Sequence, residues 1–248
     1  WTGPSWSPAD LTPAGSVGGG ILDVKNDLMV GWYWHTYSCY AGGQWWTCGW
    51  QSASSWSGIS PVFDEAVHSS GPEYDSAGGT DGQQFVGTLT YEYTEGNYTS
   101  FAYLWSSPSQ GHSLHPSGVA NSFAGAVDGN RQYGTIHTPY PGPVAHAAMW
   151  SGTAATFVDM HPAAYSRSSI SGAGDGQAVG TAYIGDTGHA LLWAGGPAAV
   201  VDLHPTGAGG SSATDVEGGL QVGSVAGRAA LWRGSAESYF DLGAAVPS

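Results

Sequence analysis

Short apolar stretches alternate with polar, glycine-rich turns along the whole chain, and three phrases return in a fixed order. The first phrase ends in tryptophan: FAYLW at 101–105, HAAMW at 146–150, HALLW at 189–193 and RAALW at 228–232. The second carries an acidic residue, as in VDMHP at 158–162 and VDLHP at 201–205. The third ends in glycine, as in AVG at 178–180 and QVG at 221–223. Repetition at a period of about 40–50 residues predicts a repeat fold.

Each unit contains the pattern of four short strands: the tryptophan phrase, the acidic phrase, a small-residue strand such as SSATDV, and the glycine phrase. Asp-Gly pairs at 128–129 and 175–176 favour tight hairpin turns. Four antiparallel strands per unit is the size of one propeller blade. We therefore expect an all-β fold, a single β-propeller domain over residues 1–248 with five four-stranded blades. Residues 228–243 would close the ring by completing the blade begun by residues 19–31, and six blades are the alternative.

The phrases HALLW, VDLHP, SSATDV and LQVG resemble the extracellular repeat family named after its His-Ala-Phe tripeptide. The first two positions of the tripeptide survive in His146-Ala147 and His189-Ala190, and Phe101 or Arg228 takes the first position elsewhere. This resemblance implies a repeat fold and an extracellular setting, and it implies no shared activity.

The charge balance excludes several classes of partner. Five Lys and Arg residues stand against 19 Asp and Glu residues, so the net charge of −14 repels phosphate backbones and argues against nucleic acid. No apolar run approaches the ~20 residues that would insert across a membrane. The sequence contains no phosphate loop, Ser-His-Asp arrangement or cysteine-based zinc pattern, and we expect no cofactor and no metal. We expect a monomer.

Cys39 and Cys48 flank a short turn and predict a cross-strand disulfide, which favours an oxidising compartment. The chain begins at Trp1 rather than Met and looks like a mature secreted form. The sequence therefore predicts a secreted, extracellular protein.

Residues that recur in every unit are expected to have architectural roles. One tryptophan position is predicted to fill the core between neighbouring sheets: Trp6, Trp56, Trp105, Trp150, Trp193 and Trp232. One aspartate position is predicted to accept backbone N–H groups: Asp10, Asp64, Asp159, Asp202 and Asp241. His115, His161 and His204 also recur, and we expect them to be hydrogen-bonded structural residues; three imidazoles converging near a propeller axis would alternatively hold a metal.

The repeat is broken most strongly at residues 31–56, an aromatic hairpin insertion with the disulfide near its tip. Alternation along a strand places Trp32 and Trp34 on one face and Tyr33, His35 and Tyr37 on the other. One hairpin cannot bury so many rings, which predicts a binding surface. The expected ligand-binding residues are Trp34, His35, Tyr37, Tyr40, Trp45, Trp46, Tyr91 and Tyr93.

Exposed aromatic rings beside hydrogen-bonding groups suit sugar recognition, so the first hypothesis is a secreted, non-catalytic module that binds a glycan. The second is a carbohydrate-active enzyme, a glycosidase or polysaccharide lyase, that uses acids outside the repeat pattern on the same face. Its candidate catalytic residues are Glu65, Glu92 and His137, and Glu73, Asp75 and Glu95 are further acids of this kind. The third is a cell-surface domain that recognises another extracellular protein.

Overall fold

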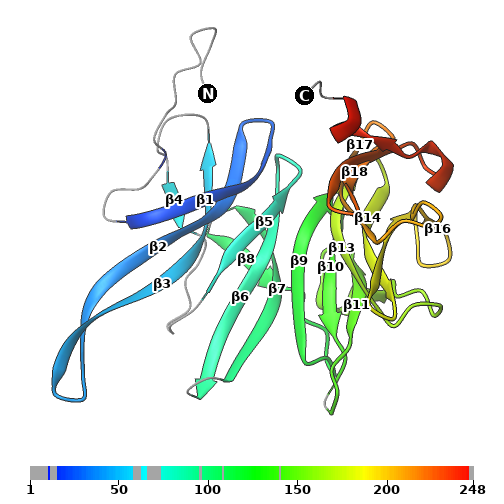
Figure 1. The fold of residues 1–248 in the computed structure, drawn as a ribbon. Coiled ribbons are helices and arrows are strands. Elements are labelled where there is room, and N and C mark those ends of the chain that lie inside the picture. The colour runs from blue at the N-terminus through cyan, green and yellow to red at the C-terminus, as the bar shows by residue number, and fades with distance from the viewer. Residues whose placement is uncertain are drawn as a thin grey trace, which may run out of the picture. The chain divides into compact units, whose positions relative to one another are not determined.

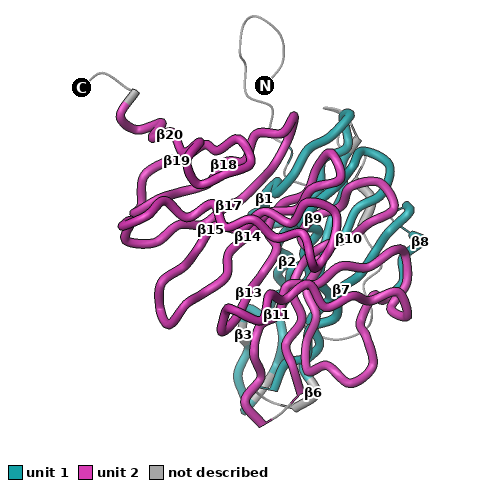
Figure 2. The backbone as a smooth tube through the Cα atoms, turned by 90° about the vertical axis from the view of Figure 1, so that its right-hand side faces the viewer, with its two compact units in different colours: residues 1–112 teal, residues 113–248 magenta. Residues whose placement is uncertain are grey.

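The computed structural model describes residue 11 and residues 16–57, 63–65, 74–94, 97–107, 109–139 and 141–245. These residues form five four-stranded antiparallel sheets, each a meander of consecutive strands (Figure 1). The chain divides into two compact units, residues 1–112 and 113–248, which Figure 2 draws in different colours. Of the described helices, none has both the length and the apolar character needed to cross a membrane.

The first unit contains two sheets. The strands of the first sheet are β1 (Ser16–Lys25), β2 (Leu28–Ala41), β3 (Gln44–Ser57) and β4 (Phe63–Glu65). Those of the second are β5 (Ser76–Thr80), β6 (Phe85–Thr94), β7 (Asn97–Ser107) and β8 (Gln110–Ser113). A buried core made by residues of both sheets, including Val30, Ala53, Phe85 and Trp105, holds them together.

The second unit contains three sheets. The third sheet has β9 (Asn121–Asp128), β10 (Arg131–His137), β11 (Ala145–Trp150) and β12 (Val158–Asp159). The fourth has β13 (Arg167–Gly174), β14 (Gln177–Ile184), β15 (Thr187–Trp193) and β16 (Val200–Asp202). The fifth has β17 (Ser211–Glu217), β18 (Leu220–Val225), β19 (Arg228–Trp232) and β20 (Phe240–Asp241). Short 3₁₀ helices are η1 (Ala154–Thr156), η2 (Ala236–Ser238) and η3 (Leu242–Ala245).

Five four-stranded sheets confirm the predicted number and size of the repeats, but the predicted closure was wrong. Residues 228–241 form β19 and β20, which pair with β18 and with each other, and residues 19–31 lie in β1 and β2, which pair with each other. Each sheet therefore begins with the small-residue strand, and every sheet except the second, whose last strand is β8, ends with the acidic phrase. The period of a repeat does not define where a unit begins, and strands joined by a hairpin belong to one sheet. The hairpin between the glycine and tryptophan phrases therefore lies inside a sheet.

The glycine that ends the third phrase allows the first two strands of each sheet to approach closely. In the fourth sheet, a Cβ on Gly180 would overlap the carbonyl oxygen of Ser169 and lie 2.8 Å from Cα of Ile170. The pairing of β13 and β14 shifts between Ile170 and Gly172, next to this contact. Equivalent glycines make the same approach in the other four sheets: Gly31, Gly87, Gly134 and Gly223.

The repeated tryptophans fill the cores, as predicted, at the five described positions: Trp56, Trp105, Trp150, Trp193 and Trp232. Trp6 lies outside the described residues. Trp193 packs among buried residues of both the third and the fourth sheets, and its Nε1 donates to the carbonyl of Met160 at 2.9 Å. The tryptophan therefore joins one sheet to the preceding one.

Candidate functional site

The aromatic hairpin is built by lengthening two strands of the first sheet. β2 and β3 have 14 residues each, whereas their counterparts β14 and β15 have 8 and 7. Pairing runs without a shift from Leu28 opposite Ser57 to Ala41 opposite Gln44. Gly42 and Gly43 both have positive φ, 61° and 82°, which a two-residue turn with the twist of the strands requires.

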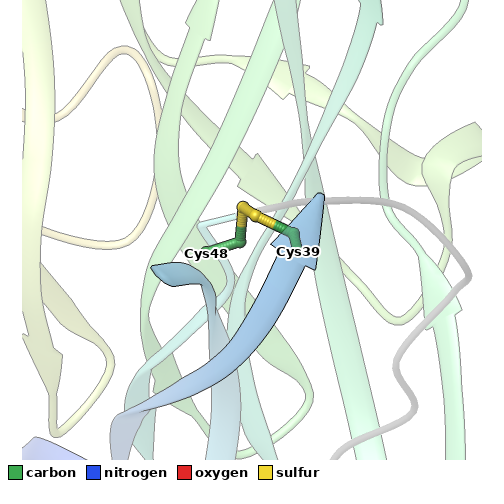
Figure 3. Close-up of a disulfide and its surroundings, with 2 residues drawn as sticks. All are labelled: Cys39 and Cys48. Carbon is green, nitrogen blue, oxygen red and sulfur yellow. A yellow bond between two sulfur atoms is a disulfide. The ribbon is translucent and has the colours of Figure 1, made fainter. Parts of the chain in front are cut away.

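A disulfide joins the two strands near the tip, as predicted (Figure 3). Cys39 lies on β2 and Cys48 on β3, with their Cα atoms 5.8 Å apart. A cross-link that closes so short a loop restricts the unfolded chain and stabilises the hairpin by about 2.5 kcal/mol. The long hairpin is therefore held in its paired form before any ligand arrives.

Side-chain alternation gives the hairpin two different faces, as predicted. Trp34 lies opposite Gln51, and Tyr40 lies opposite Trp45, so these four residues share one face, which we name the Trp34 face. The indole of Trp34 lies over Gly49, where a Cβ would come 2.6 Å from its Nε1. At the tip, Tyr40 and Trp45 are in edge contact at 5.2 Å and are 62% and 73% exposed.

The opposite face carries a series of rings in contact with one another, of which His35 and Trp50 are stacked. His35 lies 4.1 Å from Tyr33 and 4.6 Å from Trp50 between ring centroids, and Tyr37 follows at 5.3 Å from Trp50. Tyr33 is buried, whereas Tyr37 is exposed. The predicted binding residues Trp34, His35 and Tyr37 therefore do not converge on one surface, because alternation sends the last two to the other face of the sheet.

Three rings from different segments form what we name the aromatic row: Trp34, Tyr74 and Tyr98. The Trp34 and Tyr74 centroids are 5.9 Å apart, and those of Tyr74 and Tyr98 are 6.1 Å apart. Tyr74 is 55% exposed, and Tyr98 is also exposed. Glu92 lies opposite Tyr98 across β6 and β7, and the negative charge of Glu92 is the largest of the effects that raise the pKa of the Tyr98 hydroxyl. The row therefore ends in a hydrogen-bonded carboxylate.

Asp75 directly follows Tyr74 of the row and is only 4% exposed. Its N–H donates to the carbonyl of Gln51 at 3.1 Å, and Nε2 of Gln51 donates to the carbonyl of Asp75 at 2.9 Å. Its Oδ1 accepts the N–H of Thr90 at 2.9 Å. Burial raises the pKa of the carboxyl to about 7, against a smaller lowering by the Thr90 hydrogen bond. Asp75 therefore gains and loses a proton near neutral pH.

The other predicted site residues have varied positions. Tyr91 packs against the core of the first unit and makes an edge contact with Phe101 at 5.5 Å, so it has a packing role. The side chains of Trp46, Tyr93 and Glu65 lie outside the described residues, as do Glu73 and Glu95. His137 belongs to the second unit, where it contacts Phe123 at 5.3 Å and burial lowers its pKa. Tyr74 was not predicted, because it precedes a short strand in a segment without a repeated phrase.

The backbone register revises one alignment made from the sequence. Asp159, Asp202 and Asp241 lie opposite Ala148, Leu191 and Ala230, the residues that also face the repeated glycines. In the first sheet, the equivalent Ser54 lies opposite Glu65, and Asp64 lies opposite Ser55. Glu65 therefore occupies the repeated acidic position and is not an acid outside the repeat.

The repeated histidines are hydrogen-bonded structural residues, as predicted. Nδ1 of His161 lies 2.8 Å from Oγ of Ser168, which also accepts the N–H of Ala147 at 3.0 Å. Asp159 accepts the N–H of His161 at 2.9 Å and pairs with Nδ1 of His146 at 2.8 Å, and the two imidazoles stack at 4.0 Å.

The same arrangement recurs one repeat later with His189, Asp202, His204 and Ser211. His115 also pairs with Ser122 at 2.9 Å. The predicted role of the aspartates is confirmed where the structure describes them, because Asp159, Asp202 and Asp241 each accept backbone N–H groups. Within the described parts of the chain, no group of three His, Cys, Asp or Glu side chains is arranged to hold a metal.

No family model and no curated protein matches this chain. Solved structures do match, among them a puromycin hydrolase mutant complexed with PGG, with a TM-score of 0.60 at 10% identity over 95% of this chain. Another is the β-propeller domain of the Trilobed protease from Pyrococcus furiosus, described as having an open velcro topology. It has a TM-score of 0.50 at 11% identity over 92% of this chain and 84% of its own.

This chain spans 41% of the matched hydrolase chain. Identities this low are evidence of fold and not of activity. The two structural matches and the five four-stranded meanders together show that the chain has a β-propeller fold.

Proposed function

We propose that this chain is a secreted β-propeller module of five blades that recognises neutral carbohydrate through the Trp34 face and the aromatic row. The observation that carries the proposal is the row itself, in which Trp34, Tyr74 and Tyr98 from separate segments lie about 6 Å apart and two of them are exposed. Pyranose rings present apolar C–H faces that pack on aromatic planes, and their hydroxyls require polar partners beside those planes. Glu92 and the tyrosine hydroxyls provide such partners.

The Trp34 face is long enough for an oligosaccharide. Six residues separate Trp34 from Tyr40, which corresponds to about 20 Å of extended strand. Thr36, Ser38 and Thr47 have the alternation of this face and supply hydroxyls between the two aromatic ends. A glycan chain would therefore meet rings at both ends and hydrogen-bonding groups between them.

Charge supports a neutral ligand. Residues 28–57 contain no Asp, Glu, Lys or Arg, whereas the chain as a whole has a net charge of −14. An acidic polysaccharide would be repelled by the protein as a whole and would find no cation on the hairpin. The disulfide holds the hairpin rigid, which reduces the entropy lost on binding. It also supports an extracellular setting. The phrases HALLW and VDLHP support membership of the His-Ala-Phe repeat family, and we include both points in the proposal.

The test is a glycan array of neutral and acidic sugars, followed by calorimetry on the best ligand. Trp34→Ala and Tyr74→Ala are expected to lower affinity about tenfold, equivalent to about 1.4 kcal/mol. Tyr37→Ala is the matched control, because it removes an exposed ring from the opposite face of the same hairpin. Equal losses in the control and the row variants would overturn the site, and silence of every neutral glycan would overturn the function.

The two alternatives give different results in the same experiments. A carbohydrate-active enzyme would release reducing ends from a polysaccharide, and Glu92→Gln would abolish the release, because Glu92 is the described carboxylate at the end of the row. A protein-recognition domain would leave the array silent. In that case, Trp45→Ala would weaken binding to a protein partner, since Trp45 is the most exposed of the described rings at the hairpin tip.

A further inference from the structure

Asp75 joins the three segments that carry the aromatic row. Its main chain exchanges two hydrogen bonds with Gln51, at 3.1 Å and 2.9 Å, and Gln51 is the cross-strand partner of Trp34. Its own chain neighbour is Tyr74, which forms a parallel bridge with the same Gln51. Its carboxyl accepts the N–H of Thr90 on β6, the strand whose Glu92 lies opposite Tyr98. A movement of Asp75 would therefore change the separation of all three rings.

The strand register shows that Asp75 replaces a serine of the repeat. Ser168 and Ser211 occupy the same place, one residue before the pairs Ser169–Thr181 and Ser212–Ser224, as Asp75 precedes the pair Ser76–Thr88. Those two serines are buried, and each accepts a backbone N–H from the preceding sheet and pairs with a histidine. A serine does not ionise in this role, whereas an aspartate does. The substitution thus introduces a titratable group at a joint that is otherwise uncharged.

We propose that Asp75 is a positioning residue of the aromatic row and that its protonation state sets how tightly the row binds its glycan. The inference rests on the proposed carbohydrate-binding function. With its proton, the carboxyl is a neutral group that fits a nearly closed site and keeps its bond to Thr90. Without it, a carboxylate at 4% exposure lacks the hydration that stabilises it in water, which favours conformations in which the side chain reaches solvent.

Asp75 is expected to change its protonation state within the pH range of ordinary binding experiments, because burial raises its pKa to about 7. We therefore expect the aromatic row to bind its glycan most tightly below neutral pH, where the carboxyl is protonated. Its affinity is expected to fall as pH rises through 7. Other titratable side chains lie on the strands that pack against β5 and need controls: Asp23 and Lys25 on β1, Tyr33 and His35 on β2, and Tyr91 and Glu92 on β6. β3 contributes no ionisable group, because its cysteine, Cys48, is held in the disulfide.

The experiment has two readouts on the full chain, each followed from about pH 5.5 to about pH 8.5, the window around the Asp75 pKa. The first is near-ultraviolet circular dichroism of the free protein, which reports the packing of Trp34 and the two tyrosines without any ligand. The second is calorimetric affinity for the neutral oligosaccharide selected by the array. The wild-type signal is expected to titrate near pH 7, with affinity falling on the order of fivefold across the range.

Asp75→Asn keeps the shape and the Oδ1 acceptor but cannot ionise, and both of its profiles are expected to be flat. Asp75→Ser, which restores the residue of the repeat, is a second variant with the same expected loss of titration. His35→Gln is a control that should retain the wild-type midpoint in both readouts. Glu92→Gln is a control for the dichroism of the free protein alone, because Glu92 belongs to the proposed binding site. If Asp75→Asn keeps the wild-type pH profile, or if a control loses it, the inference is overturned.

The two proposals fail in different ways. If the dichroism titrates and the titration vanishes in Asp75→Asn while no glycan binds at any pH, Asp75 positions the row and the carbohydrate function is wrong. If a glycan binds through Trp34 and Tyr74 with the same affinity at every pH, the carbohydrate function stands and the role of Asp75 is refuted.

Discussion

Replacing Gly180 with alanine should destabilise the second unit far more than the loss of one hydrogen atom suggests. The new Cβ would overlap the carbonyl oxygen of Ser169 and lie 2.8 Å from Cα of Ile170, where an ordinary contact is 3.4–4 Å. Both obstacles are backbone atoms of β13, so no side-chain rotation relieves them. The strands must separate at the point where their pairing already shifts.

The magnitude follows from opposing contributions. Overpacking a tight site costs about 1–3 kcal/mol, and a weakened ladder hydrogen bond adds about 1 kcal/mol. Alanine recovers about 0.5–1 kcal/mol, because glycine loses more backbone freedom on folding. The expected net loss in the free energy of unfolding is therefore about 1–3.5 kcal/mol.

Urea denaturation followed by tryptophan fluorescence measures this loss. The matched control is Gly185→Ala in the β14–β15 turn, where a Cβ would meet open space but φ is +60°. That control should lose about 1 kcal/mol from backbone strain alone. If Gly180→Ala proves no less stable than Gly185→Ala, close backbone approach is not the reason for glycine at the end of the third phrase.

Three further results are expected. Ser168→Ala should lower the free energy of unfolding by about 1–3 kcal/mol, since it leaves the buried N–H of Ala147 without its acceptor; an unchanged urea midpoint would contradict this. Burial, and then the neighbouring imidazole, lower the pKa of His161 and of His204 below 6.5, so the folded state disfavours their protonated forms and stability should fall as pH drops below about 6.5. Thermal melts of His161→Gln should lose less stability in acid than wild type. Asp75 has the opposite effect on the pH dependence of stability. Its pKa rises from 3.8 to about 7 on folding, so stability is lost as pH rises between these values. Asp75→Asn should therefore be more stable than wild type by about 1–2 kcal/mol at about pH 5 and by about 3–5 kcal/mol at about pH 8, and a gap that does not widen with pH would refute the assignment.

The periodic phrases of the sequence predicted the number of sheets, their strands and their tryptophan cores, because each phrase recurs where the same packing recurs. Trp105, Trp193 and Trp232 are each buried among residues of their own sheet and of the sheet before it. Which strand begins each sheet was not predictable in the same way. It depends on which connections are hairpins within a sheet, and the long β2–β3 hairpin concealed that distinction.

The candidate site was predictable only in part, because its members come from separate segments. The aromatic richness of 31–56 pointed to the hairpin, and alternation separated Trp34 from His35 and Tyr37 without indicating which face carries the row. Tyr74 and the role of Asp75 depend on strand register, which brings residues far apart in sequence into contact. One signal was present in the sequence: seven residues separate His161 from Ser168 and His204 from Ser211.

The same spacing separates His68 from Asp75, where a carboxyl stands in place of the serine hydroxyl. His68 lies outside the described residues. A search of the sequence for this spacing would therefore have identified Asp75 as a repeat position with an altered residue.

Comparison with the fourth sheet shows why the first sheet presents its ring. Tyr183 stands three residues after Gly180, as Trp34 stands three residues after Gly31, so the two rings share one strand position. Tyr183 lies opposite Arg167, whose guanidinium sits 3.9 Å above its ring, and a local cation thus occupies that aromatic face. Trp34 lies opposite Gly18, a residue with no side chain to cover it. The same fold therefore covers one aromatic position with its own arginine and leaves the other in contact with Tyr74, which is the arrangement that the proposed binding site requires.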